Sequence, residues 1–268
     1  MRIITFGTLK GGTGKTTTAF NLAGILSETH KVLLIDLDPQ ANISFNAGVD
    51  VTGRGLKTVQ HIFEDNPRAK EVIFKQPVQG LPNLDIIPSS ILLEATGLNI
   101  VNLAGREQIL HNFISDNKDT LEQYDYILTD TNPSMSIINQ NAFFAADKII
   151  LITDVSANAI QGVEVFIALW GNNRRRLKKS DNISALIINN FDTRLSLSHE
   201  LVEFGRNNEA VGGLLLDTIV PYNARIKETE TSHQPINILQ AKKDTATVRE
   251  MRGIYDKIIK ELQDRGIL

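Results

Sequence analysis

The sequence predicts an α/β protein whose mainly parallel sheet, of seven or eight strands, is covered by helices on both faces. Short apolar runs rich in β-branched residues alternate with helical patterns along the whole chain, which is typical of parallel sheets buried on both faces. A glycine-rich segment lies between the first apolar run and the first helical pattern. The chain has 268 residues, 42% of them hydrophobic, and no break in composition divides it. We therefore expect residues 1–268 to form one domain with a large core.

Charge and composition exclude several classes of protein. The chain has 28 lysine and arginine residues against 31 aspartate and glutamate residues, a net charge of -3, so nucleic-acid binding would need a local basic patch. Cysteine is absent, which excludes a disulfide framework and a thiolate metal site and is compatible with a reducing cytoplasm. The apolar runs are too short for a membrane span or a secretory signal. The glycine-rich segment begins too early for a DNA-reading domain to precede it.

The glycine-rich segment has the chemistry of a phosphate-binding loop. It follows an apolar run over residues 2–6 and reads Leu9-Lys10-Gly11-Gly12-Thr13-Gly14-Lys15-Thr16-Thr17. The glycines allow backbone N–H groups to approach an anion, and the helix that follows adds the positive end of its dipole. Lys15 is placed to contact the β- and γ-phosphates, and the Thr16 hydroxyl to ligate Mg²⁺. The alternative is a glycine-rich turn with two solvated lysines.

A second lysine distinguishes this loop from the common pattern, which has glycine at the position of Leu9. The segment from Lys10 to Thr17 resembles the deviant Walker A signature of the ParA/MinD class of P-loop ATPases. The resemblance implies a P-loop NTPase fold, ATP and Mg²⁺ as cofactors, and catalytic roles for Lys10 and Lys15. It assigns nucleotide binding to Gly11, Gly12, Thr13, Gly14, Lys15, Thr16 and Thr17. In this class the signature lysine reaches the nucleotide of a second subunit, which implies an ATP-dependent homodimer.

The next strand ends in carboxylates that could bind a metal ion or take part in catalysis. A helical pattern over residues 17–28 leads to an apolar run at 31–36, which ends in Asp36-Leu37-Asp38-Pro39-Gln40. Carboxylates at the carboxyl end of a parallel strand lie where α/β sheets bind ligands, although a turn closed by Asp and Pro is an alternative. The segment resembles the second motif of the same family. The resemblance implies that Asp38 orients the attacking water and that Asp36 belongs to the Mg²⁺ shell.

The middle of the chain adds core elements and one further carboxylate. We predict helices at 56–64 and 103–117 and strands at 84–88 and 124–130. Asp130 ends the last of these strands, as a Walker B motif requires, and by resemblance holds a water of the Mg²⁺ shell. The family continues with two prolines, whereas Asn132 replaces the first of them here. The alternative for Asp130 is a cap on the helix that follows.

A strand at 148–153 and a helix at 158–177 come next, and the helix ends in a basic run. Arg174, Arg175, Arg176, Lys178 and Lys179 fit a DNA-binding patch. They fit equally well the carboxyl end of a solvated helix, where cations complement the dipole.

The last part of the chain is predicted to hold strands at 183–190 and 214–220 and a helix at 245–263. It resembles the short ParA proteins called Soj. By that resemblance Arg194 and Arg225 carry sequence-independent DNA binding, with Lys242 and Lys243 adding to it from a loop. Pro221 closes over the adenine, and Asn189 or Asn190 hydrogen-bonds the base. For each arginine alone, a surface salt bridge is the alternative.

The resemblance implies a cytoplasmic, nucleoid-associated ATPase that segregates a plasmid or a chromosome. Its ATP dimer binds nonspecific double-stranded DNA, and a centromere-binding ParB-like partner stimulates hydrolysis and release. The alternative is a MinD-like membrane-cycling ATPase that places the division site and ends in an amphipathic membrane helix. Acidic residues mixed among the apolar positions of the last helix favour packing on its own domain, so we expect no membrane partner. A third alternative is a relative of a metabolic ligase or of nitrogenase reductase, but the absence of cysteine excludes a Cys-ligated iron–sulfur cluster.

Overall fold

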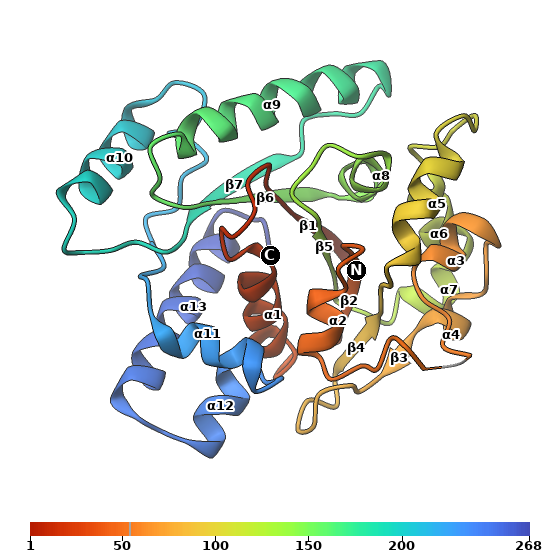
Figure 1. Cartoon of the computed structure of the whole chain (residues 1–268), viewed down its shortest axis with the longest axis horizontal. Helices are drawn as coiled ribbons and strands as arrows, with labels where there is room; N and C mark the ends of the chain where they lie inside the picture. Colours follow the sequence, from red (N-terminus) through yellow and green to blue (C-terminus); the bar gives the residue numbers. More distant parts are fainter. Residues whose placement is uncertain (54) are drawn as a thin grey trace.

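A seven-stranded sheet forms the centre of the molecule, in the order β3-β4-β2-β5-β1-β6-β7 (Figure 1). The computed structural model describes residues 1–53 and 55–268, except for the side chains of Ala224, Arg225, Lys227 and Glu230. Every strand pair is parallel except β3 with β4. The strands are β1 (Arg2–Gly7), β2 (Val32–Leu37), β3 (Phe74–Lys75), β4 (Leu84–Ile87), β5 (Tyr126–Thr131), β6 (Lys148–Thr153) and β7 (Ile183–Ile188). The predicted fold class is confirmed.

Helices cover both faces because side chains alternate along each strand. In β1, Phe6 faces one layer and Ile3 the other. The layer on the side of Phe6 consists of α1 (Lys15–Leu26), α2 (Asn42–Asn46), α11 (Ala224–Thr231), α12 (Ile236–Lys242) and α13 (Ala246–Asp264). The opposite layer consists of α3 (Gln60–Glu64), α4 (Ala69–Val72), α5 (Leu92–Ile100), α6 (Ile109–Asp116), α7 (Lys118–Leu121), α8 (Ile137–Ala145), α9 (Ala159–Arg176) and α10 (Ser196–Asn207).

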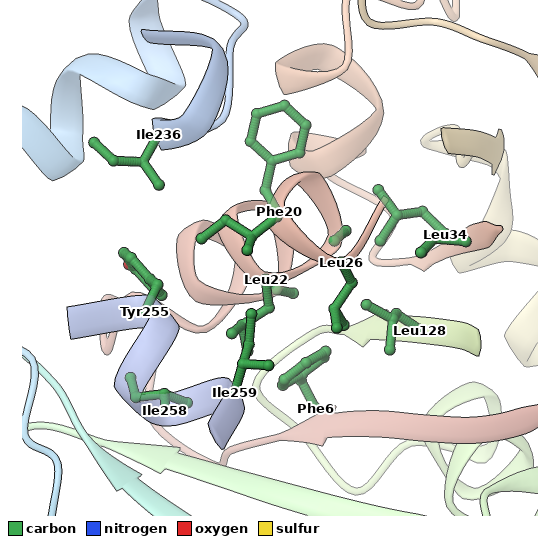
Figure 2. Packing of buried hydrophobic residues seen from close by; sticks show 14 of the residues in the cluster. Phe6, Phe20, Leu22, Leu26, Leu34, Leu128, Ile236, Tyr255, Ile258 and Ile259 are labelled. Atoms are coloured by element: carbon green, nitrogen blue, oxygen red, sulfur yellow. The ribbon is translucent and has the colours of Figure 1, made fainter. Parts of the chain in front are cut away.

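The helix that follows the phosphate loop is enclosed in the core. Figure 2 shows Phe20, Leu22 and Leu26 of α1 between the sheet and the helices α12 and α13. The contacting side chains are Phe6, Leu34 and Leu128 from the sheet and Ile236, Tyr255, Ile258 and Ile259 from the helices. The apolar side of α13 is therefore buried in its own domain, as its composition predicts. Among the described residues no helix is both long and apolar enough to cross a bilayer.

Polar contacts also attach α1 to the end of the chain. Asn21 Oδ1 accepts a hydrogen bond of 2.7 Å from the amide of Ile236. Asn237 Nδ2 donates to the carbonyl of Gly24 at 2.9 Å, and Arg252 forms an ion pair of 2.8 Å with Glu28. A Cβ atom on Gly24 would lie 2.5 Å from Pro235, so only glycine permits this approach. The phosphate-loop helix is thus held by residues more than 200 positions away in sequence.

The predicted strand at 214–220 is wrong as a continuous strand. The segment runs beside β7 with the isolated bridge of Leu186 with Leu215 and a hydrogen bond of 2.9 Å from the Val220 amide to the Ile188 carbonyl, and Pro221 bridges Phe191. The ladder is interrupted because the amides of Asp217 and Thr218 donate instead to the carboxylate of Glu261, at 2.8 and 3.1 Å. A side chain of α13 thus takes the donors that a strand would offer to its neighbour.

Other boundaries differ for local reasons. The predicted helix at 103–117 begins only at Ile109, because Gly105 has a φ of 70° and cannot continue a helix. The helix predicted at 56–64 is limited to Gln60–Glu64. Lys242 is not in a loop, since it is the last residue of α12, and Lys243 caps that helix.

Candidate functional site

The phosphate loop lies at the carboxyl edge of three adjacent strands, β2, β5 and β1. A cavity of about 420 Å³ opens there, lined by the loop itself and by Thr8, Asp38, Gln40, Asn42, Asn46 and Pro133. Gly12 and Gly14 have φ values of 78° and 79°, a conformation that other residues adopt only with strain. The sequence therefore places glycine where the loop turns into α1.

Lys15, Thr16 and Asp130 meet at the inner wall of this cavity. Lys15 is buried and forms an ion pair with Oδ1 of Asp130. The Thr16 hydroxyl donates a hydrogen bond of 2.7 Å to Oδ2 of the same carboxylate. A hydroxyl and a carboxylate oxygen so close together suit Mg²⁺, which takes few protein ligands and completes its shell with water and phosphate oxygens. No group of three or more acidic or histidine ligands occurs in the part of the chain that the structure describes, which fits such a sparsely ligated ion.

The two aspartates that end β2 have different surroundings. Asp36 is fully buried; one of its oxygens accepts the amide of Asp38 at 3.0 Å and the other accepts the hydroxyl of Ser44 at 2.6 Å. Burial, aided by the negative charge of Asp130, raises the pKa of Asp36 to about 7. Asp36 does not line the cavity, and its hydrogen bonds anchor the turn that carries Asp38.

Asp38, in contrast, lies in the cavity wall. Its Oδ1 accepts the amide of Gln40 at 2.9 Å. Burial raises the pKa of this carboxyl and the charge of Asp130 acts in the same direction, against the opposing effects of the Gln40 amide and Lys15. Of the two aspartates, only Asp38 is positioned to contact a molecule in the cavity.

Lys10 lies at the rim of the cavity with its side chain half exposed. It forms an ion pair with Asp154 and donates a hydrogen bond of 2.8 Å to the Ser156 hydroxyl. Burial alone would raise the pKa of Asp154, but the hydrogen bonds that it accepts from Lys10 and Ser156 more than offset burial and hold the pKa below its usual range. Sequence reasoning missed Asp154, although an aspartate directly after β6 belongs to the same edge of the sheet.

Asn189 braces the phosphate loop. Its Nδ2 donates to the carbonyls of Thr13 and Gly14 and to the Thr18 hydroxyl, at 3.0, 3.2 and 2.9 Å. Its Oδ1 is buried without a hydrogen-bond partner among the described residues. Asn189 also lines a second cavity of about 250 Å³, together with Asn190 and Pro221. The structure thus brings these three predicted nucleotide-binding residues together beside the loop.

The predicted DNA-binding residues have different surroundings. Arg194 is exposed, and its guanidinium makes two hydrogen bonds to the carboxylate of Asp192, at 2.8 and 2.6 Å. These bonds lower the pKa of Asp192 to about 2. Arg225 is the second residue of α11, but its side chain lies outside the described residues. Lys242 and Lys243 are exposed at the end of α12.

The basic run that ends α9 is partly occupied by contacts within the chain. Arg174 forms an ion pair of 2.7 Å with Asp181. The Lys179 ammonium lies 5.5 Å from the centre of the Phe144 ring, and burial lowers the pKa of this lysine. These contacts fit a helix end that packs against its own domain.

Comparison with known proteins places the chain in a family. A family model described as an AAA domain matches residues 1–183. The chromosome-partitioning ATPase Soj of Treponema pallidum is 30% identical over 265 residues, with 98% of each chain covered. The chromosome partitioning protein ParA of Caulobacter vibrioides is 28% identical over 249 residues, covering 90% of this chain and 88% of that protein.

Solved structures show the same fold. A Borrelia burgdorferi protein described as a plasmid partition protein, bound to AMPPNP, superposes with a TM-score of 0.75 at 25% identity, covering 97% and 98% of the two chains. The ATP complex of a Cyanothece McdA variant superposes with a TM-score of 0.83 at 20% identity, covering 98% and 96%. Because the resemblance extends along nearly the full length and includes the loop from Lys10 to Thr17, the chain belongs to the ParA/MinD class of deviant Walker A ATPases and is a Soj-like ParA ATPase.

Proposed function

We propose that this chain is a Mg²⁺-dependent ATPase that partitions a plasmid or a chromosome by switching its own affinity for DNA. The observation that carries the proposal is that Lys15, Thr16 and Asp38 line one cavity with Lys10 at its rim, while the buried Asp130 lies behind them and bonds to Lys15 and Thr16. Phosphoryl transfer to water depends mainly on positioning and on charge stabilisation. This set of residues supplies both.

Each residue has a distinct task in the proposed reaction. The N–H groups of the loop and Lys15 bind the β- and γ-phosphates, and Lys15 compensates the charge that develops on them. Asp38 orients the attacking water. Thr16 and Asp130 would hold Mg²⁺, which supplies further charge neutralisation when bound. Asp36 does not contact the nucleotide itself. It accepts a hydrogen bond from the Asp38 amide and so fixes the turn that carries Asp38.

The unpartnered Oδ1 of Asn189 supports adenine as the base. The Nδ2 of the same side chain is committed to the phosphate loop, so the group that remains for a ligand is an acceptor. The exocyclic amine of adenine donates a hydrogen bond, whereas guanine presents a carbonyl at that position. Pro221 lies in the wall of the same cavity. We infer that the base lies there.

Lys10 connects nucleotide state with dimerisation in this proposal. In the single chain it is bound to Asp154. In an ATP dimer, Lys10 would leave Asp154 and contact the triphosphate bound to the facing subunit. ATP therefore favours the dimer, and hydrolysis removes the contact that stabilises it. Two subunits then present twice the basic surface to DNA. A ParB-like partner that stimulates hydrolysis would release the dimer into the cytoplasm.

Measuring DNA binding and molecular size together tests the proposal. The purified protein is mixed with a nonspecific duplex of about 60 base pairs in the presence of ADP, ATP or a slowly hydrolysed analogue. We expect dimers and DNA binding with ATP and the analogue, and neither with ADP. Liposomes of anionic lipid, assayed in parallel, should not sediment the protein. Single subunits with every nucleotide, together with no DNA binding, would contradict the proposal.

Variants separate the assigned roles. Lys15→Ala should abolish nucleotide-dependent DNA binding. Asp38→Ala should keep ATP bound, slow turnover and so hold the dimer on DNA. Arg225→Ala should weaken DNA binding while basal hydrolysis persists; a parallel loss of hydrolysis would assign Arg225 to the active site instead.

A further inference from the structure

A groove separate from the phosphate cavity lies between α5 and α8, and we call it the α5–α8 groove. Its volume is about 550 Å³, against about 420 Å³ for the phosphate cavity. One wall is a single face of α5 and the residue that follows it, and the other is the start of α8. The lining residues are Leu93, Glu94, Gly97, Leu98 and Val101 on the first wall, Ser136, Ile137 and Ile138 on the second, and Asp38, Pro39, Gln40, Asn132 and Pro133 at the end.

The groove is apolar and open to solvent. Leu98 is 74% exposed and Val101 is 42% exposed, although both lie among residues that pack on the core. Gly97 allows α5 to lie close to α8, since a Cβ atom there would be 3.3 Å from Ile138. Exposed apolar side chains gathered along a cleft, rather than scattered singly, are typical of an interaction site.

The charge of the groove restricts what can bind in it. Its described lining residues include two carboxylates, Asp38 and Glu94, and no lysine, arginine or histidine. An acidic occupant would be repelled, and the headgroups of anionic lipids are excluded for the same reason. An occupant that combines apolar side chains with a lysine or arginine would be complementary in both respects.

A second copy of this chain fits poorly. If the two-fold axis of a symmetric dimer passed through the groove, the same hollow surface would meet itself and the groove would stay unfilled. The same symmetry would bring Glu94 close to its own copy, with like charges facing each other. A convex segment with apolar and basic side chains, supplied by another protein, is complementary to the groove in both shape and charge.

The position of the groove connects it with catalysis. Asp38, Gln40 and Pro133 line both the groove and the phosphate cavity. These residues belong to the turns that follow β2 and β5, which end at Leu37 and Thr131. A segment bound in the groove would contact the outer side of the turns whose inner side faces the triphosphate.

We propose that the α5–α8 groove binds a short amphipathic segment of the protein that stimulates hydrolysis, with its apolar side chains on Leu98 and Val101 and a lysine or arginine at Glu94. The inference rests on the proposed function, since it names the docking surface of the stimulating partner. By linkage, a segment that binds better when the turns are arranged for hydrolysis must also favour that arrangement.

A pair of synthetic peptides tests the groove directly. The probe is a fluorescein-labelled peptide with leucines at helical spacing and lysines elsewhere, and its matched control has glutamates in place of the lysines. Fluorescence anisotropy gives the affinity, and phosphate release gives the stimulation. We expect the lysine peptide to bind saturably and to accelerate hydrolysis, and the glutamate peptide to do neither.

Two substitutions and one control identify the site. Leu98→Asn and Glu94→Lys should each weaken binding of the lysine peptide by about tenfold or more, and Glu94→Lys should gain affinity for the glutamate peptide. Phe204→Asn, at a residue of α10 that is 59% exposed, should leave both affinities unchanged. Equal effects of Leu98→Asn and Phe204→Asn, or the absence of saturable binding, would overturn the inference.

The outcome for the groove is separable from that of the proposed function. Leu98→Asn should retain the ATP-dependent dimer and its DNA binding. Loss of the dimer in this variant would assign the groove to a second copy and overturn the inference while leaving the DNA switch intact. Peptide binding by a protein that never binds DNA would overturn the proposed function alone.

Discussion

The side chain of Asn189 reaches from the residue after β7 to the phosphate loop, and the loop has room for it only because residue 14 is glycine. A Cβ atom at Gly14 would lie 2.6 Å from Nδ2 of Asn189. The left-handed backbone at this position is therefore accompanied by a steric requirement. The left-handed backbone and the close approach of Asn189 both require glycine here. Only the backbone requirement can be inferred from the sequence motif.

Two alanine substitutions distinguish the cost of backbone strain from the cost of a steric clash with Asn189. Gly12→Ala should cost about 1–2 kcal/mol of unfolding free energy, because its φ of 78° is unfavourable for alanine, while nothing lies within 4 Å of the new Cβ. Gly14→Ala carries the same strain and also displaces Asn189, so we expect a further loss of roughly 1–3 kcal/mol. Urea unfolding without nucleotide measures both, and equal losses would contradict the bracing role of Asn189.

Arg194 is neutralised by Asp192 in the single chain, and this contact bears on its proposed role. If Arg194 contacts phosphates, Asp192→Asn should strengthen nonspecific DNA binding, because it frees the guanidinium and removes a negative charge. Arg194→Ala should weaken it. Filter binding with the ATP analogue measures both changes. An unchanged affinity in both variants would show that Arg194 does not contact DNA and forms only a surface ion pair of small energetic value.

At the scale of single residues, the sequence predicts which side chains end strands but not what they contact. Lys15, Asp38 and Asp130 follow apolar runs at one edge of the sheet, so their meeting is predictable. The enclosure of Asp36 by Ser44 depends on how α2 folds back on β2. The contact of Lys10 with Asp154 joins residues 144 positions apart, and no local pattern specifies it.

At the scale of elements, α13 holds α1 in place, and the ion pair of Glu28 with Arg252 is part of this contact. Burial alone would raise the pKa of Glu28, but the hydrogen bonds from Arg252 and Asn237 outweigh it, so the pKa lies below its ordinary value of 4.5. The pair therefore stabilises the fold fully above that value. The contribution is lost as the pH falls through the lower folded pKa.

Glu28→Gln should accordingly reduce the loss of stability on acidification. We expect a difference of less than about 1 kcal/mol, because the carboxylate is 40% exposed and screened by water. Urea unfolding of both proteins between about pH 5 and pH 3 measures it. Glu122→Gln, at an exposed glutamate on the opposite layer, is the matched control and should follow the wild type; an identical pH dependence in all three proteins would show that the ion pair contributes nothing.

Elements were predictable where periodicity alone decides them. The helix over Ala159–Arg176 and the strand over Lys148–Thr153 lie within one residue of their predicted ends. The segment at 214–220 has the apolar composition of a strand, yet Glu261 binds two of its amides. A competitor 44 residues away in sequence cannot be seen in a local window.

At the scale of the whole molecule, the order of the strands was not predictable, although their mainly parallel direction was. Patterning requires only that each strand be buried on both faces. The position of β1 between β5 and β6 follows from the packing of helices from distant parts of the chain. The sequence of residues 69–75 was ambiguous, because the antiparallel β3 in it has only two residues, both exposed.

Salt dependence tests the dimer as a whole. If each subunit makes about three phosphate contacts, the dimer makes about six, and its DNA affinity should fall roughly a thousandfold between about 50 and 200 mM salt. A titration of the ATP-analogue complex gives the slope. A slope half as steep would indicate that single subunits bind DNA, and a flat response would exclude phosphate contacts.

The central place of β1 has a consequence for biosynthesis. The phosphate loop leaves the ribosome before the strands that flank β1, which end at Thr131 and Thr153, and before the helices α12 and α13, which enclose α1. Because a domain folds only as its distant contacts become available, we expect the nucleotide site of the nascent chain to stay unfinished until these strands and helices have been translated.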